Sequence, residues 1–304
     1  MSLVNKVELE EAVKCYSDPY LNQDLFALKA VKSLTCDNGK VSLSIQMPYA
    51  CDGIIGGMKQ ILMTNLEFVD GVEHVEIEIS TKVAVHEAQN NLPSFDRVKN
   101  VIVVASGKGG VGKSTTSVNL ALALSQEGAK VGILDADIYG PSVGMMLGIP
   151  EGQRPETAEE KFFVPIEAHG IQAMSMAFLV DNNTPMVWRG PKVSGALLQL
   201  ATQSLWHDLD YLVIDMPPGT GDIHLSLVQS IPLTGAVVVS TPQNIALADA
   251  RKGVNMFRME SIDVPVLGMV ENMAYFTPDE LPDKKYYIFG KEGAKGLAEE
   301  MDIE

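Results

Sequence analysis

One stretch of this chain places four glycines within six residues, between an apolar run and a helical pattern. It reads Gly-Lys-Gly-Gly-Val-Gly-Lys-Ser-Thr from Gly107 to Thr115 and fits the pattern G-x-x-x-x-G-K-[ST]. The β-branched run at 101–105 predicts a strand before it, and the leucine-rich segment 116–126 predicts a helix after it. A strand, a glycine loop and a helix in this order constrain the chain to an α/β fold.

The glycine loop has the chemistry of a phosphate-binding site. Glycines let the backbone approach a polyphosphate closely, and the N-terminus of the following helix adds partial positive charge. Lys113 is expected to reach the β- and γ-phosphates, and the Ser114 hydroxyl is expected to ligate Mg²⁺. We therefore predict a nucleotide site formed by Gly107, Lys108, Gly109, Gly110, Val111, Gly112, Lys113, Ser114 and Thr115.

Four further apolar runs follow this helix, at 131–134, 211–214, 236–239 and 266–270. Helical segments separate most of them, and continuous apolar runs are typical of strands that are buried on both faces. The alternation predicts a doubly wound, mainly parallel sheet, whose ligands bind at the carboxyl ends of the strands. We predict that residues 101–304 form this P-loop ATPase domain.

A separate small α+β domain is predicted over residues 1–83. A polar linker with a proline, at 84–100, separates it from the larger domain. Asn38-Gly39 is a strong signal for a tight hairpin turn. The elements expected in this domain are a helix at 7–14, hairpin strands at 27–35 and 41–47, a helix at 54–65 and a strand at 75–79.

Composition narrows the classes of partner. The chain has 39 acidic and 23 basic residues and a formal charge of −16, which argues against nucleic acid or an anionic membrane. No apolar run reaches the roughly 18 residues of a membrane span, and the N-terminus lacks a signal-peptide layout. Cys15, Cys36 and Cys51 are too few for a disulfide framework. We therefore expect a cytoplasmic protein.

Three aspartates stand at the expected strand ends. Asp215 follows an apolar run and precedes a Gly/Pro-rich loop, which is typical of a Walker B carboxylate that supports Mg²⁺ directly or through water. Asp137 lies just past its strand, where a carboxylate is able to hold the attacking water. The alternative for Asp137 is a turn-capping carboxylate. Asp135 is expected to be structural.

The extra lysine at position 108 points to a particular class. The pattern Lys-Gly-Gly-x-x-Gly-Lys-[Ser/Thr] resembles the deviant Walker A motif of MinD, ParA and the nitrogenase iron protein. That resemblance implies an ATP-gated homodimer, in which Lys108 acts catalytically on the partner's nucleotide as an arginine finger does. An exposed loop lysine is the alternative interpretation.

Further motifs resemble the Mrp/ApbC branch of iron–sulfur cluster carrier ATPases, from about residue 95 onward. They are Gly-Ile-Leu-Asp-Ala-Asp-Ile-Tyr-Gly-Pro-Ser from Gly132, Trp-Arg-Gly-Pro from Trp188, Asp-Met-Pro-Pro-Gly-Thr-Gly-Asp from Asp215 and Val-Glu-Asn-Met from Val270. The resemblance implies that Asn272 recognises adenine, for which a turn-forming asparagine is the alternative. Arg189 belongs to the motif pattern without an assigned role.

The first domain resembles the iron–sulfur assembly domain often fused ahead of Mrp ATPases. The resemblance is carried by Asp18-Pro19-Tyr20, the hairpin around Asn38-Gly39, and the segment from Met47 to Cys51. We expect Cys51 to precede a helix, whose N-terminal dipole lowers the thiol pKa and favours a metal-binding or sulfur-exchanging thiolate. A buried structural thiol is the alternative for Cys51.

One feature of the Mrp branch is missing. Its Cys-x-x-Cys, two of which bridge a [4Fe–4S] cluster between subunits, is replaced here by a segment with Asp279, Glu280 and Asp283 and no cysteine. Carboxylates are poor substitutes for thiolates at such a cluster, so we expect this segment to be an exposed acidic loop. The branch also continues past Glu304 with another strand and helix, which is consistent with a shortened chain.

Three functions follow from these residues. The first is an ATP-hydrolysing iron–sulfur cluster carrier that works as a nucleotide-gated homodimer with acceptor or scaffold proteins as partners, and without nucleic acid or membrane. The second is a MinD- or ParA-like positioning ATPase, which normally shows a basic tail or face that is not evident here. The third, an ATP-dependent small-molecule enzyme of the dethiobiotin synthetase type, leaves Lys108 unexplained.

Overall fold

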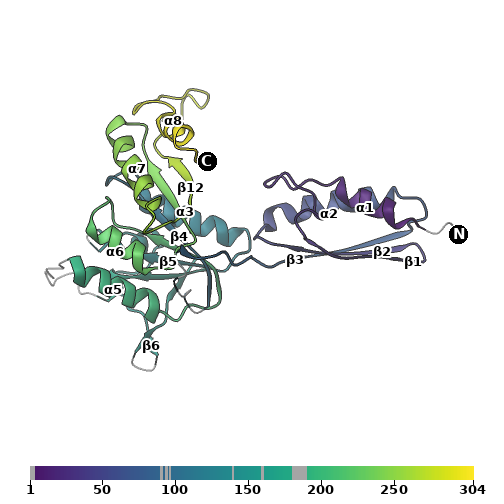
Figure 1. The fold of residues 1–304 in the computed structure, drawn as a ribbon, viewed down its shortest axis with the longest axis horizontal. Helices are drawn as coiled ribbons and strands as arrows, with labels where there is room; N and C mark the ends of the chain where they lie inside the picture. The colour runs from purple at the N-terminus through teal and green to yellow at the C-terminus, as the bar shows by residue number, and fades with distance from the viewer. Residues whose placement is uncertain are drawn as a thin grey trace. The chain divides into compact units, whose positions relative to one another are not determined.

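The computed structural model describes residues 4–89, 92, 95, 97–138, 140–158, 161–179 and 190–304, without the side chains of 190–194, 222 and 223. The chain divides into two compact units. One comprises Met1–Ala84 with Gln126–Ala129, and the other Val85–Ser125 with Lys130–Glu304. Both units are drawn in Figure 1. None of the helices in the described residues is long and apolar enough to cross a bilayer.

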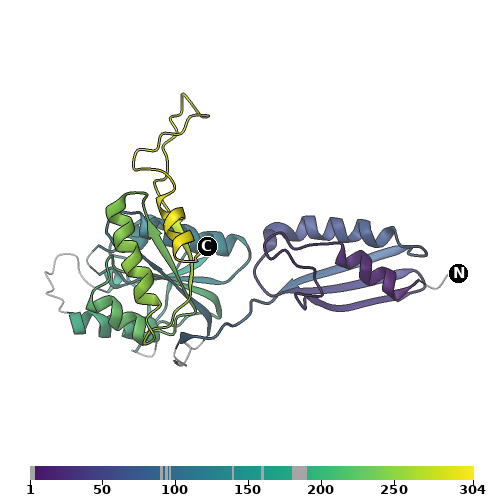
Figure 2. The ribbon, with the colours of Figure 1, turned by 45° about the horizontal axis from the view of Figure 1, so that its top comes forward.

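The N-terminal unit is a three-stranded sheet with two helices. Its elements are α1 (Lys6–Lys14), β1 (Val31–Asp37), β2 (Lys40–Met47), α2 (Asp52–Glu67) and β3 (His74–Thr81). The strand order is β1-β2-β3, with β1 antiparallel and β3 parallel to β2. Figures 1 and 2 show both helices on one face of this sheet, where Leu43, Met58 and Leu62 form part of a closed core.

The predicted hairpin turn is confirmed, but its first strand begins later than expected. Asn38 and Gly39 take positive φ angles of 48° and 79°, and Asp37 pairs with Lys40. β1 begins at Val31 rather than at residue 27, because the preceding residues form turns that end with Lys29 at a φ of 54°. A left-handed residue of this kind interrupts a strand.

The larger unit contains a seven-stranded sheet, which confirms the predicted fold class. Its order is β12-β11-β4-β10-β5-β9-β8, and all neighbouring pairs are parallel except β8 with β9. The strands are β4 (Val98–Ala105), β5 (Val131–Asp135), β8 (Ile166–Ala168), β9 (Ile171–Ser175), β10 (Leu209–Asp215), β11 (Gly235–Ser240) and β12 (Val266–Glu271). Two short strands, β6 (Thr157–Ala158) and β7 (Phe162–Phe163), pair with each other.

Helices connect and cover these strands. They are α3 (Lys113–Gln126), α4 (Val143–Met146), the 3-10 turn η2 (Met176–Phe178), α5 (Gly190–Gln203), α6 (Asp222–Ser230), α7 (Asn244–Phe257) and α8 (Gly293–Glu300). Leu197, Leu227 and Phe257, from three different helices, share one buried core with strand residues such as Leu212 and Val238. The apolar runs of the sequence are thus the buried strands of the sheet.

The sequence pattern missed two strands at one side of the sheet, the edge strand β8 and its neighbour β9, and it predicted a first strand that is too short. β8 and β9 were not expected, because Ile171–Ser175 is short and includes glutamine and serine among its five residues. β4 begins at Val98, where it pairs with Leu209, so it starts inside the segment 84–100 that was expected to be a linker. Hydrogen bonding to β10, rather than local apolarity, extends this strand toward its N-terminus.

Strand register brings the predicted site residues together. Asp215 at the end of β10 is the partner of Val104 in β4 and of Asp135 in β5. The glycine loop leaves β4 one residue after Val104, so the loop and both aspartates meet at the carboxyl edge of the sheet.

Candidate nucleotide-binding site

The glycine loop joins the carboxyl end of β4 to the first turn of α3. Gly110 and Gly112 have φ angles of 82° and 84°, a conformation that residues with a Cβ rarely adopt. A Cβ on Gly107 would lie 2.2 Å from the carbonyl carbon of Asp249 in α7. Glycine is therefore required here both by backbone conformation and by the close approach of a neighbouring helix.

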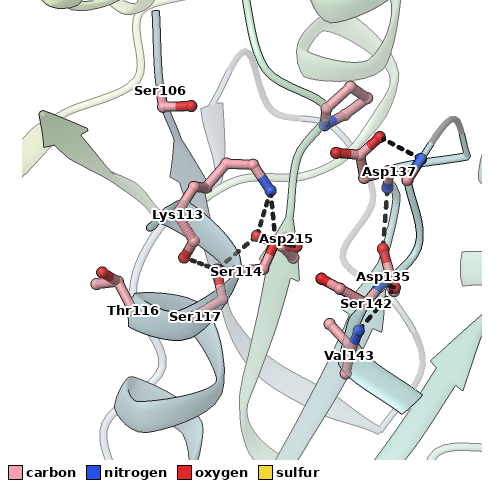
Figure 3. Close-up of polar contacts among 12 residues, drawn as sticks. Ser106, Lys113, Ser114, Thr116, Ser117, Asp135, Asp137, Ser142, Val143 and Asp215 are labelled. Carbon is pink, nitrogen blue, oxygen red and sulfur yellow. Dashed lines mark hydrogen bonds and ion pairs between the residues drawn. The ribbon is translucent and has the colours of Figure 1, made fainter. Parts of the chain in front are cut away.

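Asp215 is the centre of a buried polar cluster at the start of α3 (Figure 3). Its Oδ1 accepts from the Lys113 ammonium at 2.6 Å and from the Ser117 hydroxyl at 2.7 Å. Its Oδ2 accepts from the Ser114 hydroxyl at 2.6 Å. Asp215 is 0 % exposed and Lys113 is 6 % exposed, so this ion pair lies out of solvent and its charges balance each other.

The residues of this cluster fit a magnesium nucleotide. Hydroxyl and carboxylate oxygens are the hard ligands that Mg²⁺ takes, and those of Ser114 and Asp215 lie side by side. The backbone of Gly109 and Gly110 is exposed beside the N-terminus of α3, where a phosphate is favoured. The expected loop, lysine, serine and aspartate are therefore assembled in one place.

Asp135 is buried next to this cluster and binds backbone groups. Its Oδ1 accepts from the Asp137 N–H at 3.0 Å, and its Oδ2 accepts from the N–H groups of Ser142 and Val143 at 3.0 and 3.2 Å. Burial, and then the nearby charge of Asp215, raise the pKa of Asp135 to about 7. These contacts give Asp135 the structural role expected of it, because it ties the loop after β5 to the start of α4.

Asp137 lies half-buried in the loop after β5. Its Oδ1 accepts from the Gly140 N–H at 3.3 Å, which is the turn-capping contact weighed as the alternative to a water-holding role. Figure 3 shows Asp137 above Asp135, across the site from Lys113. Among the described residues, no hydrogen bond reaches its second carboxylate oxygen.

Lys108 is exposed at the surface of the loop. Its carbonyl oxygen accepts from the Ser106 hydroxyl at 3.0 Å, which fixes the backbone there. Among the described residues, nothing forms an ion pair with its ammonium group. This exposure fits both the role across a dimer and the exposed-loop alternative.

Asn272, just after β12, contacts the glycine loop directly. Its side-chain N–H donates to the Val111 carbonyl at 2.8 Å, and a Cβ on Gly112 would lie 2.0 Å from the same nitrogen. Among the described residues, the other amide N–H and the side-chain oxygen form no further hydrogen bond, and an amide has both the donor and the acceptor that an adenine edge pairs with. The position is compatible with the expected base contact, and it also supports the loop.

Two residues of the site were not foreseen. Ser117 lies one helical turn after Lys113 and donates a hydrogen bond to Asp215. Its i, i+4 spacing from Lys113 places both side chains on the same face of the helix, and this spacing is the sequence signal that predicts the contact. His224 in α6 is 7 % exposed, and its Nε2 donates to the Pro217 carbonyl at 2.8 Å. The Gly219 N–H donates to the Ser106 carbonyl at 2.8 Å. These contacts anchor the loop after Asp215 on both sides.

The expectation of a low-pKa thiol at Cys51 is wrong. Cys51 does stand immediately before α2, as its N-cap, but it is fully buried. Burial raises the thiol pKa, and the charges of Asp52 and Asp18 raise it further, while a hydrogen bond with Thr81 acts in the opposite direction. Desolvation therefore outweighs the helix dipole, and the burial of this thiol fits the structural alternative.

The segment 273–290 between β12 and α8, which we call the aromatic arm, is exposed along most of its length. Figure 2 shows it projecting away from the sheet. Its Tyr275, Phe276, Tyr286, Ile288 and other large apolar side chains are at least 39 % exposed. Phe276 and Tyr286 exchange two backbone hydrogen bonds, of 2.9 and 2.8 Å.

The acidic residues of the arm do not form a metal site. Asp279, Glu280 and Asp283 are exposed. Across the part of the chain that the structure describes, no group of three or more His, Cys, Asp or Glu side chains is placed to hold a metal ion. Trp188 and Arg189 of the family motif lie outside the described residues.

The fold and this site define a P-loop nucleotide-binding protein. The family described as NUBPL iron-transfer P-loop NTPase matches residues 97–304, and the family of iron–sulfur cluster assembly proteins matches residues 6–79. The chain therefore belongs to the iron-transfer P-loop NTPase family, which confirms the resemblance drawn from Lys108 and the strand-end motifs.

Curated relatives and a solved structure agree with this family. An iron–sulfur cluster carrier protein of Pseudomonas fragi is 60 % identical over 81 % of this chain and 84 % of its own. The carrier protein of Escherichia coli K12 is 48 % identical over 93 % and 76 %. A nucleotide-binding protein of Archaeoglobus fulgidus, solved in complex with ADP, matches with a TM-score of 0.60 and 39 % identity, over 69 % of this chain and 80 % of its own.

Proposed function

We propose that this protein binds and hydrolyses ATP with Mg²⁺ and uses that cycle to hold and release an iron–sulfur cluster for acceptor proteins. The observation that carries the proposal is the cluster in which Lys113, Ser114 and Ser117 converge on the buried Asp215. The relatives named as iron–sulfur cluster carriers support the cargo.

Each residue of the site has a proposed task in ATP hydrolysis. The loop N–H groups and Lys113 bind the phosphates, Ser114 and Asp215 hold Mg²⁺, and Asn272 contacts adenine. A bound Mg²⁺ would supply positive charge that offsets the negative charge of the phosphates. Asp137 holds the attacking water through the carboxylate oxygen that does not cap its own turn.

We further propose that two copies of the chain act together. The exposed Lys108 supports this, because its ammonium has no ion-pair partner among the described residues and the partner's phosphates supply one. A [4Fe–4S] cluster takes four thiolates, which two copies of the chain are able to supply together.

The thiols for such a cluster lie in the N-terminal unit. Cys15 is exposed, Cys36 is intermediate and Cys51 is buried, and none of them is in a disulfide. Free thiols fit the reducing cytoplasm, where we place the protein. Cys51 remains a candidate ligand that has to be uncovered before it binds iron.

The cargo is tested by anaerobic reconstitution with iron and sulfide. We expect the full chain to bind iron and sulfide in equal amounts and to transfer them to an apo-acceptor protein. Serine replacement of Cys15, Cys36 or Cys51, one at a time, identifies the ligands by loss of bound iron. Absence of both cluster binding and transfer in the wild-type chain would contradict the proposal.

The ATPase part is tested by two lysine variants. Lys113→Ala removes the phosphate contact and is expected to lower ADP affinity about 100-fold or more, because it also leaves the buried Asp215 without its cation. Lys108→Ala is expected to bind ADP normally and to hydrolyse ATP slowly. Hydrolysis by Lys108→Ala at the wild-type rate contradicts the role of this lysine across the dimer.

A further inference from the structure

Ser117 is a buried hydroxyl in the second turn of α3. It is 0 % exposed, and its Oγ lies 2.7 Å from Asp215 Oδ1 and 3.0 Å from the Lys113 carbonyl oxygen. A hydroxyl has one proton, and the charged carboxylate is the stronger and nearer of the two acceptors. Figure 3 shows Ser117 on α3 below Lys113, on the side that faces Asp215.

The other two donors to Asp215 have a second task when nucleotide binds. On the proposed function, on which this inference rests, the Lys113 ammonium moves to the phosphates and the Ser114 oxygen moves to Mg²⁺. The Lys113 bond to Asp215 is then exchanged for a bond to the phosphates, and the Ser114 oxygen takes the metal as a second partner. Ser117 has no exposed surface through which it reaches a ligand, so its bond to Asp215 persists.

We propose that Ser117 is a positioning residue for the metal-holding aspartate. Its hydroxyl fixes Oδ1 of Asp215, so that Oδ2 stays turned toward Ser114 and the metal after Lys113 has left. The terminal torsion of an aspartate is broad, so a carboxylate without this donor is free to rotate. A buried oxygen left without a partner also seeks one, which turns the group away from the metal.

Three variants separate positioning from packing. Ser117→Ala removes the hydroxyl, whereas Ser117→Thr keeps it at the same position. Ser117→Cys preserves volume but replaces the strong donor with a weak one. Asn119→Ala is the matched control, since Asn119 is exposed on the same helix and its side chain donates to the Thr115 carbonyl at 2.8 Å.

Calorimetric titration of the full chain with ADP, in EDTA and in Mg²⁺, measures the metal-dependent gain in affinity without requiring turnover. We expect Ser117→Ala to bind ADP in EDTA as the wild type does and to lose about tenfold or more of the gain from Mg²⁺, the loss typical of a broken partner of a metal ligand. Ser117→Thr and Asn119→Ala are expected to keep the gain. In ATPase assays, Ser117→Ala is expected to need about tenfold more Mg²⁺, with KM for ATP unchanged at saturating metal.

The outcomes separate the two proposals. An unchanged Mg²⁺ gain in folded Ser117→Ala overturns the positioning role and leaves the nucleotide site intact. Equal losses of affinity in EDTA and in Mg²⁺ also overturn it, because they indicate a general packing defect. If Ser117→Ala does not fold, Ser117→Cys carries the same expectations. A wild-type chain that binds no ADP overturns the proposed function itself.

Discussion

Asp135 and Asp215 are register partners at the ends of two adjacent parallel strands, yet they bind different kinds of group. Asp215 binds the Lys113 ammonium, whereas Asp135 accepts backbone N–H groups of the next loop. Burial and the charge of Asp215 raise the pKa of Asp135 to about 7, so Asp135 titrates near neutrality.

The raised pKa of Asp135 predicts a pH dependence of stability. In the unfolded chain this carboxyl titrates near its ordinary pKa of about 4, so between about pH 4 and 7 only the folded protein keeps the proton. Its contribution to the free energy of unfolding is therefore largest at low pH and is lost as pH rises through about 7.

Urea unfolding of the wild type and of Asp135→Asn at pH 5 and pH 8 checks this. The variant keeps an oxygen acceptor and has no proton to lose. We expect the wild type to lose stability relative to Asp135→Asn from pH 5 to pH 8. A difference that stays constant, or that favours the wild type more at pH 8, contradicts the assignment.

Asn272 is expected to determine base preference as well as loop position. Removing its side chain in Asn272→Ala removes the donor to the Val111 carbonyl and the groups proposed to contact adenine. We expect ADP affinity to fall roughly tenfold and the preference for ADP over GDP to fall with it. Fluorescence titration with both nucleotides measures this, and equal losses for the two bases restrict Asn272 to supporting the loop.

Gly107 is expected to contribute to stability because a larger residue does not fit at its position. A Cβ at this position would lie 2.2 Å from the Asp249 carbonyl carbon and 2.7 Å from the Ala250 nitrogen, both of which are backbone atoms of α7. Gly107→Ala should therefore destabilise the protein by at least about 1–3 kcal/mol. The control is Gly109→Ala, whose Cβ has its nearest neighbour at 3.8 Å. Thermal unfolding of both variants compares them, and equal melting temperatures refute the steric account.

Cys51 is expected to react slowly. Its pKa is raised by burial, and the thiolate is the reactive form, whereas Cys15 is exposed. At pH 8, iodoacetamide should modify Cys15 about tenfold or more faster than Cys51, as followed by peptide mass spectrometry. The difference should disappear in urea. Fast labelling of Cys51 in the folded chain would contradict this prediction and support the low-pKa thiolate expected from the helix dipole.

The sequence predicted the position of the site residues correctly where one short motif determines both their place in the fold and their chemistry. The order of strand, glycine loop and helix predicted the location of Lys113, Ser114 and Asp215, because parallel strands deliver their carboxyl ends to one edge. It did not reach Ser117 or His224, whose roles depend on groups distant in sequence. Strands β8 and β9 were missed because they are short and partly polar.

Cys51 marks the limit of reasoning from local position. The sequence pattern correctly placed it before a helix, and from that position alone a lowered pKa follows. The sign of the shift depends on how deeply tertiary packing buries the thiol, and burial is decided by strands elsewhere in the N-terminal unit. Such a balance is visible only in the folded chain.

Asp215 and a nucleotide phosphate compete for the same partner, the Lys113 ammonium. A nucleotide gains the Lys113 ammonium only by displacing a carboxylate already bound at 2.6 Å. Without a metal to take over the released Asp215, that exchange leaves a buried charge unpaired, which is costly. Metal and nucleotide are thus expected to bind as a pair, with each raising the affinity for the other by the same factor.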